Sequence, residues 1–372
     1  MKRGNLFLSV IGGAGLLLAA GAVPLLGWRL QSPRPLDVVI LDHTVPDTTY
    51  RGHRAVVWVL NHLRIVHHRS RTPYDAARDY AGFVPLTDRA WAVRPFPKPL
   101  GGARVVYVAD TYGVPASGQR HGDTGAPERM LAGGMSGAEI DALEAAASAG
   151  ATLIGEFNLA AEPTGDSIRA RVERLFGYRS SGWIGRRFED LTRGVPGWVR
   201  EGWSRQEGRV WDGVGAGFVL TNRDGRVLLL DRRVLEGSGL DIVPTAAGDA
   251  LGMDASPAPG GWFDLAEPAG STALAWYVWR LTPAGDSVLA AAGVPRAAAV
   301  TWRRSGVASV YYLAGDFASA SPLPRWTRLR WTGTMYRMAP AALLPRGAAF
   351  FWRGYLPLLS SILDAAAQNP GG

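Results

Sequence analysis

Short runs of apolar, often β-branched residues alternate with amphipathic stretches through the first half of the chain. Leu36–Leu41 (LDVVIL), Ala103–Ala109 (ARVVYVA) and Ala151–Phe157 (ATLIGEF) are nearly continuous apolar runs. Such runs are typical of strands that are buried on both faces, as in a parallel sheet. Between and after them, Arg54–Val66 and Asp166–Phe176 carry apolar residues at helical spacing. The pattern therefore predicts alternating strands and helices.

The clearest predicted helix is Ser136–Gly150. Ser136 and Glu139 have the spacing of a capping box, and Gly150 follows the last apolar position as a stop signal. Strands and helices in this order, joined by short links, imply right-handed crossovers. We therefore expect an α/β fold with a doubly wound, mostly parallel sheet of the flavodoxin-like type.

The pattern changes at about residue 205 and changes back at about residue 291. Phe218–Thr221 and Arg226–Leu230 flank the sequence NRDG, which is a hairpin signature. We interpret 205–290 as a β-rich insertion between two parts of the α/β domain, 34–204 and 291–372. The last part ends in a predicted helix, Gly347–Ala366, which contains Pro357 and is expected to pack on the sheet.

The N-terminal residues 1–33 have the pattern of a membrane anchor and linker. Asn5–Trp28 is uncharged and apolar, which is long enough to span a bilayer, and Lys2 and Arg3 precede it. A cleaved signal peptide is the alternative, because Ala20-Gly21-Ala22 resembles a cleavage site. With the anchor retained, the chain would be a single-pass protein of the bacterial inner membrane, with its bulk facing the periplasm or exterior.

The composition of the chain excludes several kinds of partner and functional site. The net charge is +8, but Lys occurs only at Lys2 and Lys98, and the remaining basic residues are Arg dispersed along the chain. No basic run is interleaved with aromatic residues, so nucleic acid is not an expected partner. The chain has no Cys, which excludes disulfides, zinc–thiolate sites, iron–sulfur clusters and thiol nucleophiles.

No metal or other cofactor is predicted. His62, His67 and His68 are close in sequence, but they lack the i, i+4 spacing that places two imidazoles on one helix face. The neighbouring Arg64 and Arg69 would also repel a cation.

Two segments resemble the class I glutamine amidotransferase-like proteins, including their ThuA-like group. The run MSGAEIDALEAAASAGATLIGEFN resembles the helix–glycine–strand unit of that family, and AAAVTWRRSGVASVYYLAGDF resembles its late hairpin. The resemblance implies the amidotransferase-like fold and by itself implies no reaction.

The chain departs from the family at both catalytic positions. The strand Ala151–Phe157 leads into Asn158, Leu159 and Ala160, where the enzymatic members have a Cys between glycines. The late Gly-His is Gly315-Asp316 here. Acyl transfer through a Cys or Ser nucleophile is therefore excluded on this template.

Four acidic residues lie at or beside the ends of predicted strands: Asp42, Asp110, Glu156 and Asp316. The carboxyl ends of parallel strands share one edge of a sheet, where ligands bind. Carboxylates crowded there raise one another's pKa, as acid–base catalysis at a glycosidic bond requires. We therefore take Asp110 and Glu156 as the candidate catalytic pair and Asp42 and Asp316 as ligand-binding residues.

Three other polar residues follow the same strands and would supply hydrogen bonds to a ligand: His43, Tyr112 and Asn158. The competing interpretation is that polar residues at strand ends cap the next turn or helix.

These observations lead to one functional hypothesis and two alternatives. The leading hypothesis is a membrane-anchored protein without amidotransferase activity that binds envelope or extracellular carbohydrate, consistent with eleven of the fourteen Trp residues lying after residue 180. The first alternative is a glycan hydrolase that uses the strand-end carboxylates. The second is a structural partner in an envelope complex.

Overall fold

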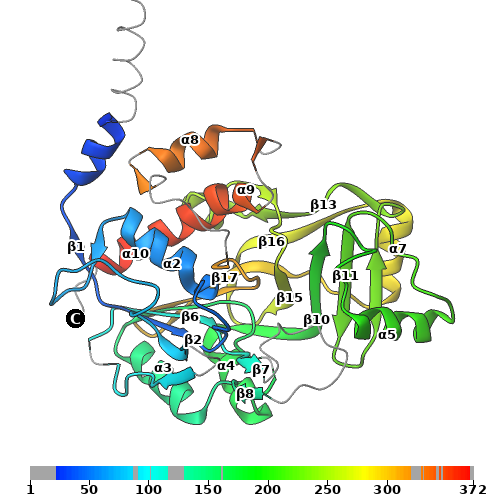
Figure 1. Ribbon diagram of the computed structural model, residues 1–372, viewed down its shortest axis with the longest axis horizontal. Coiled ribbons are helices and arrows are strands. Elements are labelled where there is room, and N and C mark those ends of the chain that lie inside the picture. The colour runs from blue at the N-terminus through cyan, green and yellow to red at the C-terminus, as the bar shows by residue number, and fades with distance from the viewer. Residues whose placement is uncertain are drawn as a thin grey trace, which may run out of the picture.

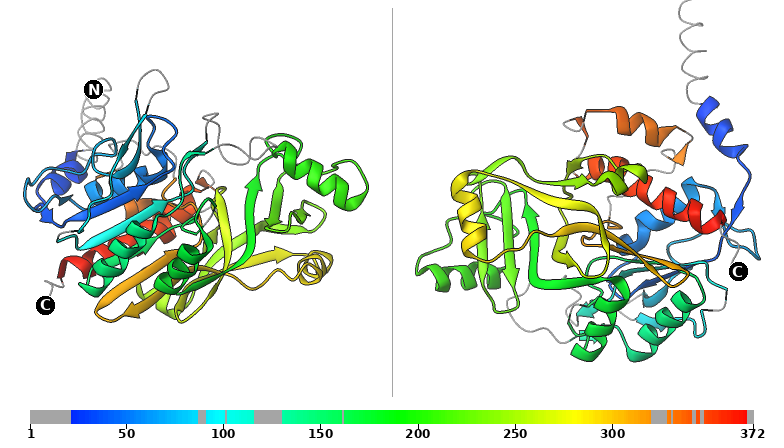
Figure 2. Two further views of the ribbon diagram at one scale, coloured as in Figure 1. Left: turned by 90° about the horizontal axis from the view of Figure 1, so that it is seen from below. Right: turned by 180° about the vertical axis from the view of Figure 1, so that it is seen from behind.

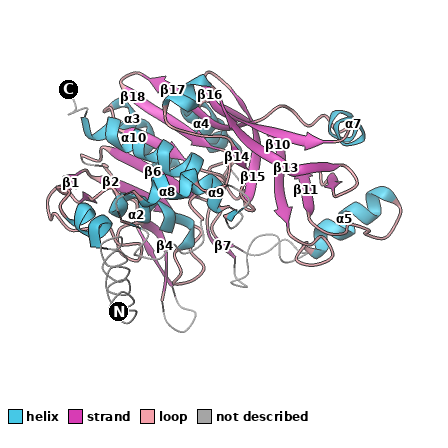
Figure 3. Cartoon of the chain, turned by 90° about the horizontal axis from the view of Figure 1, so that it is seen from above, coloured by secondary structure: helices cyan, strands magenta, loops and turns pink. Residues whose placement is uncertain are grey.

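The computed structural model describes residues 22–368 except 87–90, 101, 116–129, 161, 320–327, 330, 341–342 and 345–346. The described strands form one 14-stranded sheet and two small two-stranded sheets. The large sheet runs the length of the molecule (Figure 3). Its main path has the strand order β12-β11-β10-β15-β17-β18-β9-β6-β2-β4-β5.

Parallel pairing is confined to one end of this sheet. It joins β4 (Ala81–Pro85), β2 (Val38–Asp42), β6 (Val105–Asp110), β9 (Thr152–Gly155) and β18 (Ala308–Leu313). β6 and β9 consist of buried residues apart from partly exposed Asp110, as their apolar sequences predict. The small sheets pair β1 (Arg34–Pro35) with β3 (Ile65–Val66) and β7 (Val114–Pro115) with β8 (Met130–Ala132).

All other pairing in the large sheet is antiparallel. At the two ends of the parallel part, β4 pairs with β5 (Trp91–Arg94) and β18 pairs with β17 (Ala298–Ser305). The remaining antiparallel strands are β10 (Tyr178–Phe188), β11 (Gly217–Asn222), β12 (Val227–Leu230), β13 (Leu235–Pro244), β14 (Ser256–Pro257), β15 (Trp262–Pro268) and β16 (Thr272–Leu281). The predicted hairpin is β11–β12. The strands of the 205–290 segment thus continue the same sheet that contains the parallel part.

The expectation of a doubly wound, mostly parallel, flavodoxin-like sheet is therefore wrong, because the sheet is mixed. The prediction extrapolated from the buried apolar runs in the first half of the chain. In β10, with the sequence YRSSGWIGRRF, seven of the eleven residues are partly or fully exposed. Antiparallel strands of this kind leave one face to solvent and so lack a continuous apolar run.

Helices cover both faces of the parallel part. Figure 1 shows α2 (Arg51–His62) and α10 (Leu356–Gln368) on one face and α3 (Gly137–Ser148) and α4 (Asp166–Phe176) on the other. Figure 2 shows the same arrangement from below and from behind. The capping box of α3 is present as predicted, and α4 ends at Gly177, which has a left-handed conformation. α2 ends before the predicted Val66, because Ile65 and Val66 form β3.

The remaining helices lie around the antiparallel part and at the C-terminus. They are α5 (Gly197–Glu207), α6 (Ala246–Ala250), α7 (Pro283–Ala291), α8 (Thr332–Met338) and α9 (Ala348–Phe350). A π-helical turn, η4 (Phe351–Tyr355), joins α9 to α10 just before Pro357. Proline removes a backbone donor, so a local change of helix type keeps the helix continuous. This helical run packs on the sheet, as predicted, through the hydrogen bond between Tyr355 and Tyr107 of β6.

The predicted membrane segment lies mostly outside the described residues. Its described part, residues 22–28, belongs to a helix that spans 22–29. Among the residues that the structure describes, no helix is long and apolar enough to cross a membrane. Trp28, the last residue of the predicted segment, donates a hydrogen bond to the carbonyl oxygen of His62 at 2.9 Å. These findings contradict the expected single-pass inner-membrane location, and we withdraw it.

Candidate functional site

The parallel strands bring the four predicted carboxylates together at one edge of the sheet. Asp42 and Asp110 end β2 and β6 and are paired in register. Glu156 directly follows β9, and Asp316 follows β18. The charges of Asp42 and Asp316 both act on Asp110, and those of Asp110 and Asp316 act on Glu156. The four groups therefore share one electrostatic environment.

The seven predicted site residues differ in their access to solvent. Asp42 and Glu156 are fully buried. The other five are partly exposed: His43, Asp110, Tyr112, Asn158 and Asp316. A ligand at this edge can reach the partly exposed side chains but not the two buried carboxylates.

Asp110 has the strongest features of a proton-transfer group. One carboxylate oxygen accepts a hydrogen bond from the backbone N–H of Tyr112 at 2.7 Å, and the other accepts from the side-chain amide of Asn158 at 3.2 Å. Burial and the neighbouring charge of Asp42 outweigh these bonds and raise the pKa of Asp110 to about 7. A carboxyl group that titrates near neutral pH can act as an acid or a base.

Asn158 is held in a backbone conformation that supports this contact. Its φ of 70° lies in the left-handed region, which Asn tolerates better than most residues. Its carbonyl oxygen accepts a hydrogen bond from the Thr111 hydroxyl at 2.9 Å. The turn after β9 thereby directs the amide of Asn158 toward Asp110.

His43 forms an ion pair with Glu139 of α3. Nε2 of His43 lies 3.0 Å from Oε1 of Glu139, and the two side chains are 15% and 10% exposed. Burial lowers the pKa of His43, but the hydrogen bond and charge of Glu139, together with Asp42 and Asp110, outweigh it and raise the pKa above its ordinary value. Nδ1 of His43 is buried and has no hydrogen-bond partner in the described part of the chain.

Glu139 takes part both in the cap of α3 and in the ion pair with His43. Its other oxygen, Oε2, accepts hydrogen bonds from the backbone N–H and the hydroxyl of Ser136, at 2.8 and 2.7 Å, in the capping box. Burial raises the pKa of Glu139, but His43 and Ser136 hold it below its ordinary value. The sequence identified Glu139 only as a capping residue.

Replacing Glu139 with Gln should lower the pKa of His43. The amide oxygen can still accept the capping bond, but the negative charge that stabilises the imidazolium is lost. A titration of the His43 ring followed by NMR should show the pKa falling by about one unit. An unchanged pKa would mean that Glu139 only caps the helix.

Glu156 occupies a different environment from the one expected for a catalytic acid. Oε1 is hydrogen-bonded to the Tyr107 hydroxyl, and Oε2 accepts a hydrogen bond from the backbone N–H of Ala318 at 3.0 Å. The Tyr107 hydroxyl is in turn 2.9 Å from the Tyr355 hydroxyl. Burial raises the pKa of Glu156 well above its ordinary value. The residue thus links the sheet to the C-terminal helical run.

The raised pKa values predict how stability depends on pH. Burial raises the pKa of Asp110 to about 7 and that of Asp264, outside the site, to about 6. Such carboxyls contribute stability below their unfolded pKa near 4, and this contribution is lost as pH rises through the folded pKa. We expect the Asp110→Asn variant, which cannot ionise, to gain about 2–4 kcal/mol relative to the natural protein between pH 4 and pH 8.

Urea unfolding of both proteins across this range measures the difference. A difference that stays constant with pH would show that Asp110 has an ordinary pKa.

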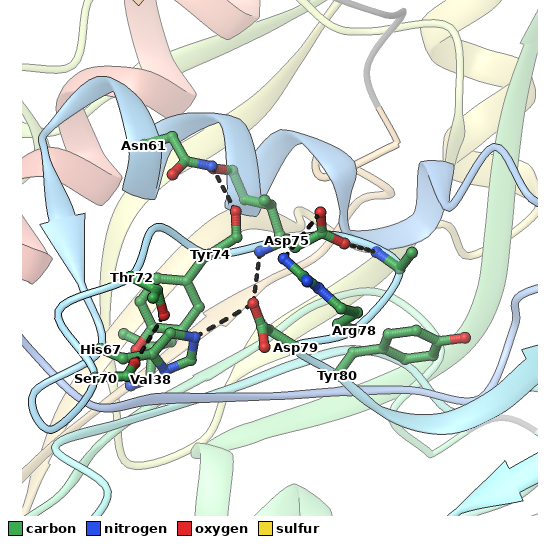
Figure 4. Close-up of polar contacts among 12 residues, drawn as sticks. Val38, Asn61, His67, Ser70, Thr72, Tyr74, Asp75, Arg78, Asp79 and Tyr80 are labelled. Carbon is green, nitrogen blue, oxygen red and sulfur yellow. Dashed lines mark hydrogen bonds and ion pairs between the residues drawn. The ribbon is translucent and has the colours of Figure 1, made fainter.

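The histidines considered for a metal site are engaged elsewhere. Nδ1 of His62 lies 3.0 Å from the carbonyl oxygen of Arg328. His67 forms an ion pair with Asp79 at 3.2 Å and packs against the ring of Tyr74 (Figure 4). Within the described residues, no group of three or more His, Cys, Asp or Glu side chains could hold a metal ion.

The tryptophans do not gather at this edge. Trp183, Trp203 and Trp352 are buried in the core. Trp262 is partly exposed and lies beside Asp316, whose N–H donates a hydrogen bond to the Trp262 carbonyl oxygen at 3.0 Å. The three buried residues therefore have packing roles.

Comparison with known proteins yields structural matches only. No family model and no curated protein sequence matches the chain. The resemblance to the amidotransferase-like family therefore remains a prediction.

Three solved structures similar to the chain are carbohydrate-acting enzymes. A β-galactosidase from a Rahnella species is 11% identical, with 84% of this chain and 33% of that chain covered and a TM-score of 0.35. An exo-β-1,4-mannosidase from an Opitutaceae bacterium is 10% identical, with coverages of 87% and 36% and a TM-score of 0.33. The carbohydrate deacetylase Agd3 is 11% identical, with coverages of 87% and 33% and a TM-score of 0.34. The chain thus spans about a third of the length of these proteins, and likeness at these scores assigns no reaction to it.

Proposed function

We propose that the chain is a carbohydrate hydrolase whose general acid is Asp110. The observation that carries the proposal is a carboxyl group beside the polar side chains of His43 and Asn158, on a residue that is partly exposed, with its pKa raised to about 7 by burial and by Asp42. Protonated near neutral pH, Asp110 would give its proton to the leaving oxygen of a glycosidic bond.

Asp316 is the second carboxylate of the proposed reaction. It is partly exposed, and its charge acts on Asp110. Glycoside hydrolysis commonly uses two carboxyl groups, one as the acid and the other as the base or nucleophile. In this scheme Asp110 gives its proton to the leaving oxygen as the C–O bond breaks, and water bonds to the anomeric carbon while Asp316 takes the proton of that water. Exchange with solvent then removes the proton from Asp316 and returns one to Asp110. This assignment replaces Glu156, which the ligand cannot reach.

His43 and Asn158 complete the proposed site. The raised pKa of His43 favours the imidazolium form, whose positive charge suits a polar ligand beside several carboxylates. The similar β-galactosidase and mannosidase agree with carbohydrate as the substrate class. Their TM-scores are below 0.5, so the support for the reaction comes from the chemistry of the site.

The test is a panel of 4-nitrophenyl glycosides and oligosaccharides, assayed for nitrophenol and for new reducing ends. We expect turnover of at least one substrate by the natural protein and by Asp249→Asn, which changes an exposed carboxylate in α6. The Asp110→Asn variant should lose most of its turnover on an oligosaccharide, whose leaving oxygen must be protonated. Binding of a glycan without turnover by the natural protein would instead support the carbohydrate-binding hypothesis.

A further inference from the structure

A buried His–Asp pair lies next to Asp110, because its aspartate, Asp42, is the partner of Asp110 across β2 and β6. The side chains of His53 and Asp42 are both fully buried, and His53 Nδ1 is 2.7 Å from Asp42 Oδ2. The other ring nitrogen, Nε2, is 2.8 Å from the carbonyl oxygen of Ala76. Both nitrogens therefore face acceptors, and an imidazole that donates from both nitrogens is in its cationic form. In that form, the positive charge of His53 would offset the negative charge of Asp42.

The surroundings keep this pair away from any ligand. A Cβ atom on Gly52 would lie only 2.5 Å from Asp42 Oδ2, and one on Gly82 would lie 1.9 Å from the carbonyl oxygen of Asp42. The ring of Tyr80 packs on His53 with the ring centres 4.5 Å apart. Because the pair is closed in on these sides, it can act only through other residues.

Two links connect the pair to Asp110. Asp42 Oδ1 accepts a hydrogen bond from the N–H of Thr44 at 2.9 Å. The Thr44 side chain hydrogen-bonds to Asp110, and its oxygen also accepts from the N–H of Gly113 at 3.0 Å. The second link is electrostatic, because the charge of Asp42 acts on Asp110.

We propose that His53 is a positioning residue: by neutralising Asp42 it controls the charge beside Asp110 and thereby how tightly Asp110 holds its proton. The titratable groups that interact with Asp110 come from several elements: Asp42 from β2, His43 after β2, Glu156 after β9 and Asp316 after β18. Among these neighbours, Asp42 is paired with the fully buried side chain of His53.

Two single variants and their combination test this proposal. His53→Asn keeps a donor near the position of Nδ1 but removes the cation, so the charge of Asp42 is no longer offset. Asp42→Asn removes the negative charge. The carboxyl of Asp110 is titrated by ¹³C NMR in protein labelled at Asp, with its signal assigned by its absence in Asp110→Asn.

The two single variants should shift the titration of Asp110 in opposite directions. We expect His53→Asn to raise its pKa and Asp42→Asn to lower it, each by about one unit. The double variant should return it close to the natural value, because both charges are gone. Shifts of the same sign in both single variants, or no shift in either, would overturn the proposal.

The design remains decisive if His53→Asn does not fold. Breaking one side of a buried ion pair is strongly destabilising, whereas the double variant leaves no buried charge. In that case the comparison uses the other two variants. The proposal is supported if the pKa of Asp110 is lowered in Asp42→Asn and returns to its natural value in the double variant. It is contradicted if the pKa of Asp110 stays low in the double variant.

His67→Asn is the matched control. His67 also pairs with a carboxylate, Asp79, but the two side chains are 28% and 23% exposed. The same substitution there should leave the titration of Asp110 unchanged.

The inference deepens the proposed function, since it concerns the same acid, but its test does not depend on turnover. If the glycoside panel failed but the predicted NMR shifts appeared, the influence of His53 on Asp110 through Asp42 would still stand. Turnover without those shifts would leave the proposed function intact and remove His53 from it.

Discussion

Replacing Asp110 with Asn is expected to reduce turnover of a glycoside with a poor leaving group by about 10²–10⁴-fold. The variant loses the proton that the leaving oxygen must receive. It keeps an oxygen that can accept the hydrogen bond from the N–H of Tyr112, so the turn after β6 should remain in place. The measurement is kcat and KM on matched substrates that differ only in the leaving group.

The leaving group provides the internal control. A dinitrophenyl glycoside leaves as a stable anion and needs little protonation, so Asp110→Asn should retain much of its activity on this substrate. An equal loss on both substrates would mean that Asp110 does not act as the acid.

Replacing Glu156 with Ala should lower the free energy of unfolding by about 3–5 kcal/mol. The change leaves the Tyr107 hydroxyl and the N–H of Ala318 without their hydrogen-bond partner and opens a cavity under the C-terminal helical run. Burial raises the pKa of Glu156 well above its ordinary value, which favours the neutral, protonated form of the side chain. Glu156→Gln imitates that form and should cost less than about 1 kcal/mol.

Urea unfolding at neutral pH distinguishes the two variants. Glycoside turnover by Glu156→Gln provides a second readout, and it should stay within a few-fold of the natural protein. Complete loss of turnover in a stably folded Glu156→Gln variant would restore Glu156 as a catalytic residue, as its sequence position predicted.

The buried strands of the parallel part could be predicted because burial on both faces requires continuous apolar runs. β2, β6 and β9 are such runs, and the capping box of α3 is a local signal that depends on Ser136 and Glu139 alone. The long strand β10 could not be identified in this way. Its polar residues, with Arg179 and Ser180 near its start, do not distinguish it from a loop.

The sequence predicted where the candidate site lies, but not which of its carboxylates a ligand could contact. Carboxylates that end parallel strands meet at one edge for topological reasons, which placed Asp110 and Glu156 together. Which of them faces solvent depends on the local turn and on the packing of Tyr355, and sequence spacing carries no information on either. His53 was missed because its partner, Asp42, reaches it only through the fold of the intervening loop.

The measurement that tests the role of Asp110 most directly is the pH dependence of kcat/KM on a glycoside with a poor leaving group. It reports the pKa of the acid in the free enzyme. If Asp110 is that acid, kcat/KM should fall about tenfold for each pH unit above about 7, the pKa to which burial raises Asp110. A profile that stays level to about pH 9, or one that falls with a midpoint near 4 as for an unperturbed carboxyl, would contradict the role assigned to Asp110.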